Sequence, residues 1–182
     1  MTDHYFEFSS PVKLVAGFRA LEHIPFELET RGATRPLIVS DKGVVAAGLV
    51  EVVMAAVRAE GGNVGPVFDD VPPDSSMEAV EAGARVYLES GCDAIIAVGG
   101  GSVMDTAKGI NIVVTEEVED IMEVAGAGAV KQRLKPLVAV PTTAGTGSEV
   151  TLAAVIADHD RNLKMPFTST FLLPDVAILD SR

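Results

Sequence analysis

Apolar positions recur along most of the chain in two alternating patterns, one typical of buried strands and one typical of amphipathic helices. Short continuous apolar runs occur at residues 36–40, 94–98 and 137–140, as expected of strands covered on both faces. Helical spacing of apolar residues follows the first two of these runs, at residues 43–60 and 102–114. This alternation predicts a doubly wound, mostly parallel α/β sheet of Rossmann-like type.

Weaker patterns complete this prediction. Asp158, His159 and Asp160 have the composition of a hairpin turn. The stretch at 116–132 is charged and contains glycine, and we expect a short helix and a loop there. The remaining expectations are a short β-hairpin or edge strand at 5–15, a weak strand at 63–68, a helix at 75–89 and strands at 150–157 and 176–179.

Composition restricts the class of protein. With 182 residues, 48% of them hydrophobic, we expect a single globular domain over residues 1–182. Cys92 is the only cysteine, so no disulfide can form within the chain, and we expect a cytoplasmic protein. No apolar run reaches the roughly 20 residues of a membrane helix, and the first ten residues do not resemble a secretory signal. A net charge of −12 argues against nucleic acid as a partner.

The strongest candidate for ligand binding follows the predicted strand at 94–98. Gly99, Gly100, Gly101 and Ser102 lie between this strand and the next helix, where bare backbone N–H groups could receive a pyrophosphate. The alternative is a tight turn in which Ser102 caps the helix and Asp105 completes a capping box. Met104 breaks the G-x-G-x-x-G pattern, and no Walker sequence is present.

Two more candidates follow neighbouring predicted strands. After the strand at 137–140, a loop rich in hydroxyl groups contains Thr142, Thr143 and Thr146, which suits a diphosphate, although a merely polar loop is the alternative. Asp41 follows the strand at 36–40, where its carboxylate could bind both hydroxyls of an adenosine ribose, or could only cap the next helix. An acid at this place would repel a 2′-phosphate. Ligands of open α/β sheets bind at such strand ends.

Other reactive side chains do not form recognisable sites. Cys92 precedes a buried strand and is expected to act as a small hydrophobic residue. The three histidines are scattered without metal-ligand spacing. No G-x-S-x-G nucleophile elbow is present, so acyl transfer has no support.

Taken together, VSDKGVVAAG around Asp41, GGGSVMDTAKGI at 99–110 and AVPTTAGTGSEVT at 139–151 resemble the iron-containing alcohol dehydrogenase family. The ending LLPDVAILD resembles the strand that closes that family's N-terminal domain. The resemblance implies an NAD(P)-dependent oxidoreductase that interconverts an alcohol and an aldehyde or ketone, with a cofactor domain followed by an all-helical domain that binds iron or another divalent metal.

The resemblance also implies residue roles. Asp41 would bind the adenosine ribose and favour NAD over NADP, and residues 99–102 would bind the pyrophosphate. Thr142, Thr143 and Thr146 would contact the diphosphate and the nicotinamide ribose, and Lys164 would lie near the cofactor. Pro73 and Asp74 stand where many relatives have Asn-Pro.

The metal half is expected to lie elsewhere. The family's one aspartate and three histidines that bind the metal would all fall beyond Arg182, so no metal ligand or catalytic residue is expected in these 182 residues, and the segment alone should not turn over. The edge at 5–15 suggests a homodimer. Two alternatives stay open, namely a non-catalytic nucleotide-binding module and a relative of glycerol dehydrogenase or dehydroquinate synthase.

Overall fold

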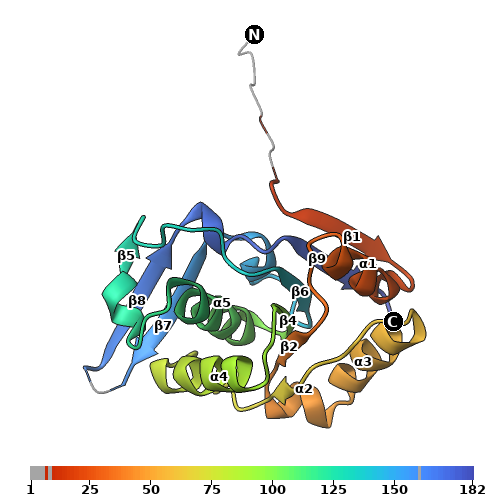
Figure 1. The fold of residues 1–182 in the computed structure, drawn as a ribbon, viewed down its shortest axis with the longest axis horizontal. Coiled ribbons are helices and arrows are strands. Elements are labelled where there is room, and N and C mark those ends of the chain that lie inside the picture. The colour runs from red at the N-terminus through yellow and green to blue at the C-terminus, as the bar shows by residue number, and fades with distance from the viewer. Residues whose placement is uncertain (1–6, 8–9, 160) are drawn as a thin grey trace.

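A six-stranded parallel sheet forms the centre of the chain in the computed structural model, which describes Glu7 and residues 10–159 and 161–182 (Figure 1). Every neighbouring pair of its strands is parallel, which confirms the predicted doubly wound α/β class. From one edge to the other, the strands are β1 (Lys13–Gly17), β9 (Val176–Asp180), β6 (Leu137–Pro141), β4 (Ala94–Gly99), β2 (Pro36–Val39) and β3 (Val67–Phe68).

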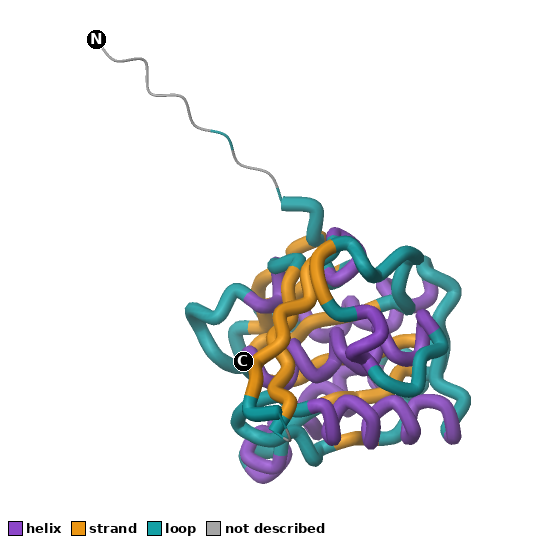
Figure 2. The backbone as a smooth tube through the Cα atoms, turned by 90° about the vertical axis from the view of Figure 1, so that its left-hand side faces the viewer, coloured by secondary structure: helices purple, strands orange, loops and turns teal. Residues whose placement is uncertain are grey.

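Helices cover both faces of this sheet, as the tube view also shows (Figure 2). Alternate residues of β4 point to opposite layers, so Ile95 packs against α4 and α5 while Ile96 packs with α1 and α3. Both faces of the strand are therefore buried, which explains its uninterrupted apolar run. The helices are α1 (Ile24–Glu29), α2 (Lys42–Ala46), α3 (Leu49–Ala59), α4 (Met77–Glu89) and α5 (Gly101–Glu116), with short 3-10 helices at Ala20–His23, Ile121–Val124, Ser148–Val150 and Thr170–Leu172.

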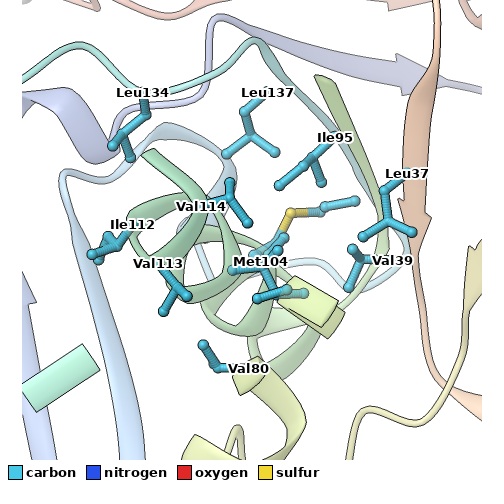
Figure 3. Close-up of a cluster of buried hydrophobic side chains, with 14 of the residues drawn as sticks. Leu37, Val39, Val80, Ile95, Met104, Ile112, Val113, Val114, Leu134 and Leu137 are labelled. Carbon is cyan, nitrogen blue, oxygen red and sulfur yellow. The ribbon is translucent and has the colours of Figure 1, made fainter. Parts of the chain in front are cut away.

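The larger of the two apolar clusters fills the space between the sheet, α4 and α5. Figure 3 shows Met104 of α5 directed toward Leu37, Val39 and Ile95 of the strands, with Val80 of α4 nearby. Met104 and Ile95 are at most 1% exposed. The same residue that breaks the glycine fingerprint therefore anchors the start of α5 against the sheet.

A smaller second sheet packs beyond α5. It contains β5 (Gly126–Ala127), β8 (Leu163–Thr168) and β7 (Ala153–Asp158), of which β7 and β8 are antiparallel. The predicted turn at Asp158 and His159 connects these two strands, although Asp160 lies outside the described residues. The strand β8 itself is not among the predicted elements.

Three boundaries differ from the predictions. The predicted helix at 43–60 is two helices, because Gly48 adopts a left-handed backbone with φ of 78° between α2 and α3. The strand expected at 150–157 begins only at Ala153, after a 3-10 turn. Of the hairpin or edge strand predicted at 5–15, residues 5, 6, 8 and 9 lie outside the described residues. Its end overlaps β1, which runs on to Gly17 and pairs in parallel with β9 at the edge of the sheet, so the edge-strand alternative is confirmed.

Candidate cofactor-binding site

Loops from neighbouring strands meet at the carboxyl edge of the sheet and enclose a cavity of about 690 Å³. Asp41 follows β2, and Gly100, Gly101 and Ser102 follow β4. Thr142 and Thr143, which follow β6, and residues 69–73, which follow β3, also line the cavity. The structure thus brings six of the nine predicted site residues to one cavity, because β6, β4 and β2 are adjacent in the sheet.

The first turn of α5 opens onto this cavity without a side-chain cap. The alternative in which Ser102 caps the helix is wrong, since Gly100 is the N-cap residue and the Ser102 hydroxyl donates to the carbonyl oxygen of Pro73. Asp105 completes no capping box, because its carboxylate accepts a bond of 3.0 Å from the backbone N–H of Val155. The N–H groups of the first turn are therefore left available for an anionic ligand, at the positive end of the helix dipole.

The three glycines serve different purposes. A Cβ atom at Gly99 would lie 2.5 Å from Val103, so this glycine allows β4 to turn sharply into α5. At Gly100 the added atom would lie 3.1 Å from the hydroxyl of Thr143, which shows how closely the two loops approach. At Gly101 the nearest atom would be the Ser148 hydroxyl oxygen, 3.5 Å away, which is an ordinary van der Waals contact. Together they form a cradle that side chains would fill.

Asp41 both caps a helix and lines the cavity. Its carboxylate accepts a bond of 2.9 Å from the N–H of Val44, so the structure confirms the capping alternative for α2. A backbone bridge also joins Asp41 to Asp70, which fixes the loops after β2 and β3 relative to each other. The carboxylate is thereby held in one place at the end of the cavity where we expect the ribose.

Besides Gly99, two predicted site residues lie outside the wall of the cavity. Thr146 is adjacent to the start of α5, 3.7 Å from the position of an added Cβ at Gly101. Lys164, on β8, forms an ion pair of 3.0 Å with Asp74. It lines a separate small cavity of about 110 Å³, together with Asp105 and Ser102. Since Ser102 lines both cavities, the smaller one adjoins the larger.

Sequence reasoning missed the structural importance of Lys108. This side chain is fully buried in the core side of α5, and its ammonium donates to the carbonyl oxygens of Ser148, Thr151 and Ala153 at 2.8–2.9 Å. Burial lowers the pKa of Lys108 to about 8, although Asp105 and Glu149 act in the opposite direction. The available signal was a lysine on the apolar face of a helix, between Ala107 and Ile110.

Burial also affects two other ionisable groups. It raises the pKa of Asp105, against the lowering effect of the hydrogen bond from Val155 and of the nearby Lys108. It likewise raises the pKa of the Cys92 thiol, a side chain that belongs to the core, in agreement with its expected part as a small hydrophobic residue. Burial thus disfavours the nucleophilic thiolate form of Cys92.

Metal-binding and membrane-spanning features were also sought among the described residues. Within Glu7, 10–159 and 161–182, no three His, Cys, Asp or Glu side chains group closely enough to hold a metal ion. None of the helices in this part of the chain combines the length and apolar character needed to cross a membrane.

Comparison with known proteins identifies the family of this chain. Residues 11–181 match the family described as iron-containing alcohol dehydrogenase. The chain belongs to this family. Its predicted resemblance is therefore confirmed, over nearly the whole of the 182 residues.

Individual members of the iron-containing alcohol dehydrogenase family resemble the chain closely. It is 43% identical to a 4-hydroxybutyrate dehydrogenase of Cupriavidus necator, over 90% of this chain and 42% of that protein. It is 36% identical to a choline dehydrogenase of Bacillus subtilis, over 97% of this chain and 44% of that protein. The chain thus spans less than half the length of these curated relatives.

Solved structures of the family share the fold. A crystal structure of 1,3-propanediol oxidoreductase superposes with a TM-score of 0.88 at 34% identity, over 97% of this chain and 46% of that one. A sulfoacetaldehyde reductase from Bifidobacterium kashiwanohense, in complex with NAD⁺, superposes with a TM-score of 0.83 at 29% identity, over the same shares of the two chains. The cavity described above therefore belongs to a fold that holds NAD⁺ in a relative.

Proposed function

We propose that this chain binds NAD(H) and supplies the cofactor-binding part of an oxidoreductase that interconverts an alcohol and an aldehyde or ketone. The observation that carries the proposal is the uncapped first turn of α5, which opens with Gly100 and Gly101 onto a cavity that also contains Asp41. When bound, the nicotinamide ring would accept or donate the hydride.

The residues around the cavity fit the parts of a dinucleotide. The carboxylate of Asp41 would accept hydrogen bonds from the adenosine ribose, and the N–H groups of the first turn of α5 would bind the pyrophosphate. The hydroxyl groups of Thr142 and Thr143, in the loop after β6, would donate hydrogen bonds to the diphosphate. Gly99 would act indirectly, because it allows the sharp turn that places Gly100 and Ser102.

Thr146 and Lys164 would contact the nicotinamide half of the cofactor. Thr146 lies beside the start of α5, and Lys164 lines the small adjoining cavity with Ser102. The described residues do not offer a ligand set for iron or another divalent metal, so we assign no step of the reaction to a metal ion here.

Two further parts of the proposal concern the state of the protein. β1 is at an edge of the sheet and exposes Leu14, at 49%, and Phe18, which follows the strand, is 74% exposed; this apolar edge supports a homodimer. Light scattering of the purified chain tests the homodimer, and a monomeric mass would exclude it.

The buried, weakly acidic thiol of Cys92 suits the reducing conditions of the cytoplasm.

Calorimetric titration with NADH tests the binding site directly. We expect the unmodified chain to bind NADH, and Gly101→Val to weaken binding at least about tenfold, because the new side chain fills the cradle while its Cβ meets only ordinary contacts. Glu78→Val is the matched control, since it places valine in the first turn of α4, away from the cavity. Equal NADH affinity of Gly101→Val and the unmodified chain would disprove the proposed site.

A further inference from the structure

The ribose end of the cavity has an unusual balance of charge. Asp41, Asp69 and Asp70 all line it, and Lys42 is the one cation among the described residues that do so. A 2′-phosphate on the adenosine ribose, which distinguishes NADP from NAD, would bring about two negative charges to this end. Binding of NADP would therefore depend on what Lys42 can contact.

Lys42 is already engaged by a carboxylate. Its ammonium forms an ion pair with Asp70, and that contact, together with the nearby Asp69, raises the pKa of Lys42. The backbone bridge between Asp41 and Asp70 keeps the partner in place, because it ties the loop after β3 to the loop after β2. Lys42 follows Asp41 directly as the first residue of α2, so the pair lies next to the expected ribose site.

We infer that Asp70 is a specificity-determining residue that disfavours NADP(H), because it neutralises Lys42 and adds negative charge beside the 2′ position. This inference rests on the proposed function and extends it, since the selection is shared between Asp41, in the loop after β2, and Asp70, in the loop after β3. Asp41 alone would leave Lys42 free to pair with a 2′-phosphate. Asp70 removes that possibility while leaving a free 2′-hydroxyl unaffected.

The test compares the Kd of NADPH with the Kd of NADH by calorimetry in low-salt buffer. Asp70→Asn keeps the shape of the side chain and the backbone bridge but removes the charge. We expect the NADPH/NADH Kd ratio to fall about fivefold, as is reasonable for an exposed charge pair. Adding Lys42→Met to this variant should reverse most of this fall in the ratio. Raising the salt concentration should make the fall smaller.

Asp69→Asn is the matched control, because it removes an equal charge from the same cavity wall without touching the ion-pair partner of Lys42. If Asp69→Asn lowers the NADPH/NADH Kd ratio as much as Asp70→Asn does, the inference is overturned, because the loss of any negative charge from this wall would then explain the effect. An unchanged ratio in Asp70→Asn, with NADH still bound, would overturn the inference alone. Absence of NADH binding in the unmodified chain would overturn the proposed function and this inference together.

Discussion

Replacing Lys108 with methionine tests how α5 is held to the segment at residues 148–153. The lysine ammonium has three hydrogens, and three carbonyl oxygens accept from it, those of Ser148, Thr151 and Ala153. These carbonyls belong to the segment that follows the Thr142–Thr143 loop, while Lys108 belongs to α5. Methionine has a similar length and fits an apolar environment, but it donates nothing to these oxygens.

The expected loss of stability follows from two opposing effects. Hydrogen bonds from a charged donor contribute about 1.5–3 kcal/mol each. Burying the ammonium costs stability, and the fall in the pKa of Lys108 from 10.5 to about 8 corresponds to about 3 kcal/mol of that cost. We therefore expect Lys108→Met to lower the free energy of unfolding at neutral pH by about 3 kcal/mol, with the hydrogen bonds as the larger effect.

The same lysine gives the stability difference a defined pH dependence. Its pKa is lower in the folded chain than in the unfolded chain, so between about pH 8 and pH 10.5 the unfolded chain binds more protons. The unmodified chain should gain stability relative to Lys108→Met over this range. The gap should widen by about 2 kcal/mol between about pH 7 and about pH 9.5.

Urea unfolding followed by circular dichroism measures both quantities. Lys131→Met is a suitable control, because Lys131 is an exposed lysine and its replacement should change stability by less than about 0.5 kcal/mol. A Lys108→Met variant as stable as the unmodified chain at neutral pH would refute the bonding argument. A gap that stays constant from about pH 7 to about pH 9.5 would refute the lowered pKa.

Two further substitutions probe the framework around the site. Gly65→Ala should destabilise the chain by about 3 kcal/mol in urea unfolding, since its Cβ would lie 2.1 Å from the carbonyl oxygen of Pro36 at the start of β2; unchanged stability would contradict this close approach. Glu27→Gln should cost about 2 kcal/mol at neutral pH, because a carboxylate only 1% exposed loses its ion pairs with Lys13 and Arg31. Burial raises the pKa of Glu27, but the hydrogen bonds and charges of those two cations outweigh burial, so the net pKa is lowered. The stability difference between the unmodified chain and Glu27→Gln should therefore disappear as the pH falls through this lowered pKa. A stability difference independent of pH would contradict that direction.

Continuous apolar runs made the centre of the fold predictable. β4 and β6 are covered on both faces, so their sequences alone indicate interior strands. β8 escaped prediction because five of its six residues are only partly buried or exposed on the outside of a small sheet, and Pro166 interrupts its pattern. The break between α2 and α3 depends on the backbone of Gly48, which apolar periodicity does not record.

The loops of the site were predictable for a different reason. Adjacent parallel strands deliver their carboxyl ends to one edge, so Asp41, Gly100 and Thr142 had to lie near one another once the strand order was right. The detailed bonding of polar groups was not predictable in this way. Ser102 donates to Pro73 and not to its own helix, because the loop after β3 passes within reach of it, a contact between segments 29 positions apart.

The pairing of β1 with β9 has a consequence for biosynthesis. Lys13 is in register with Val176, so during synthesis the backbone groups of β1 must wait until residues more than 150 positions later have emerged from the ribosome before they find this partner. Until then β1 offers an unpaired edge to other nascent chains, and the sheet must close through a contact of very long sequence separation. Chaperone demand during translation should therefore centre on this amino-terminal strand, and its docking should be among the last steps of folding.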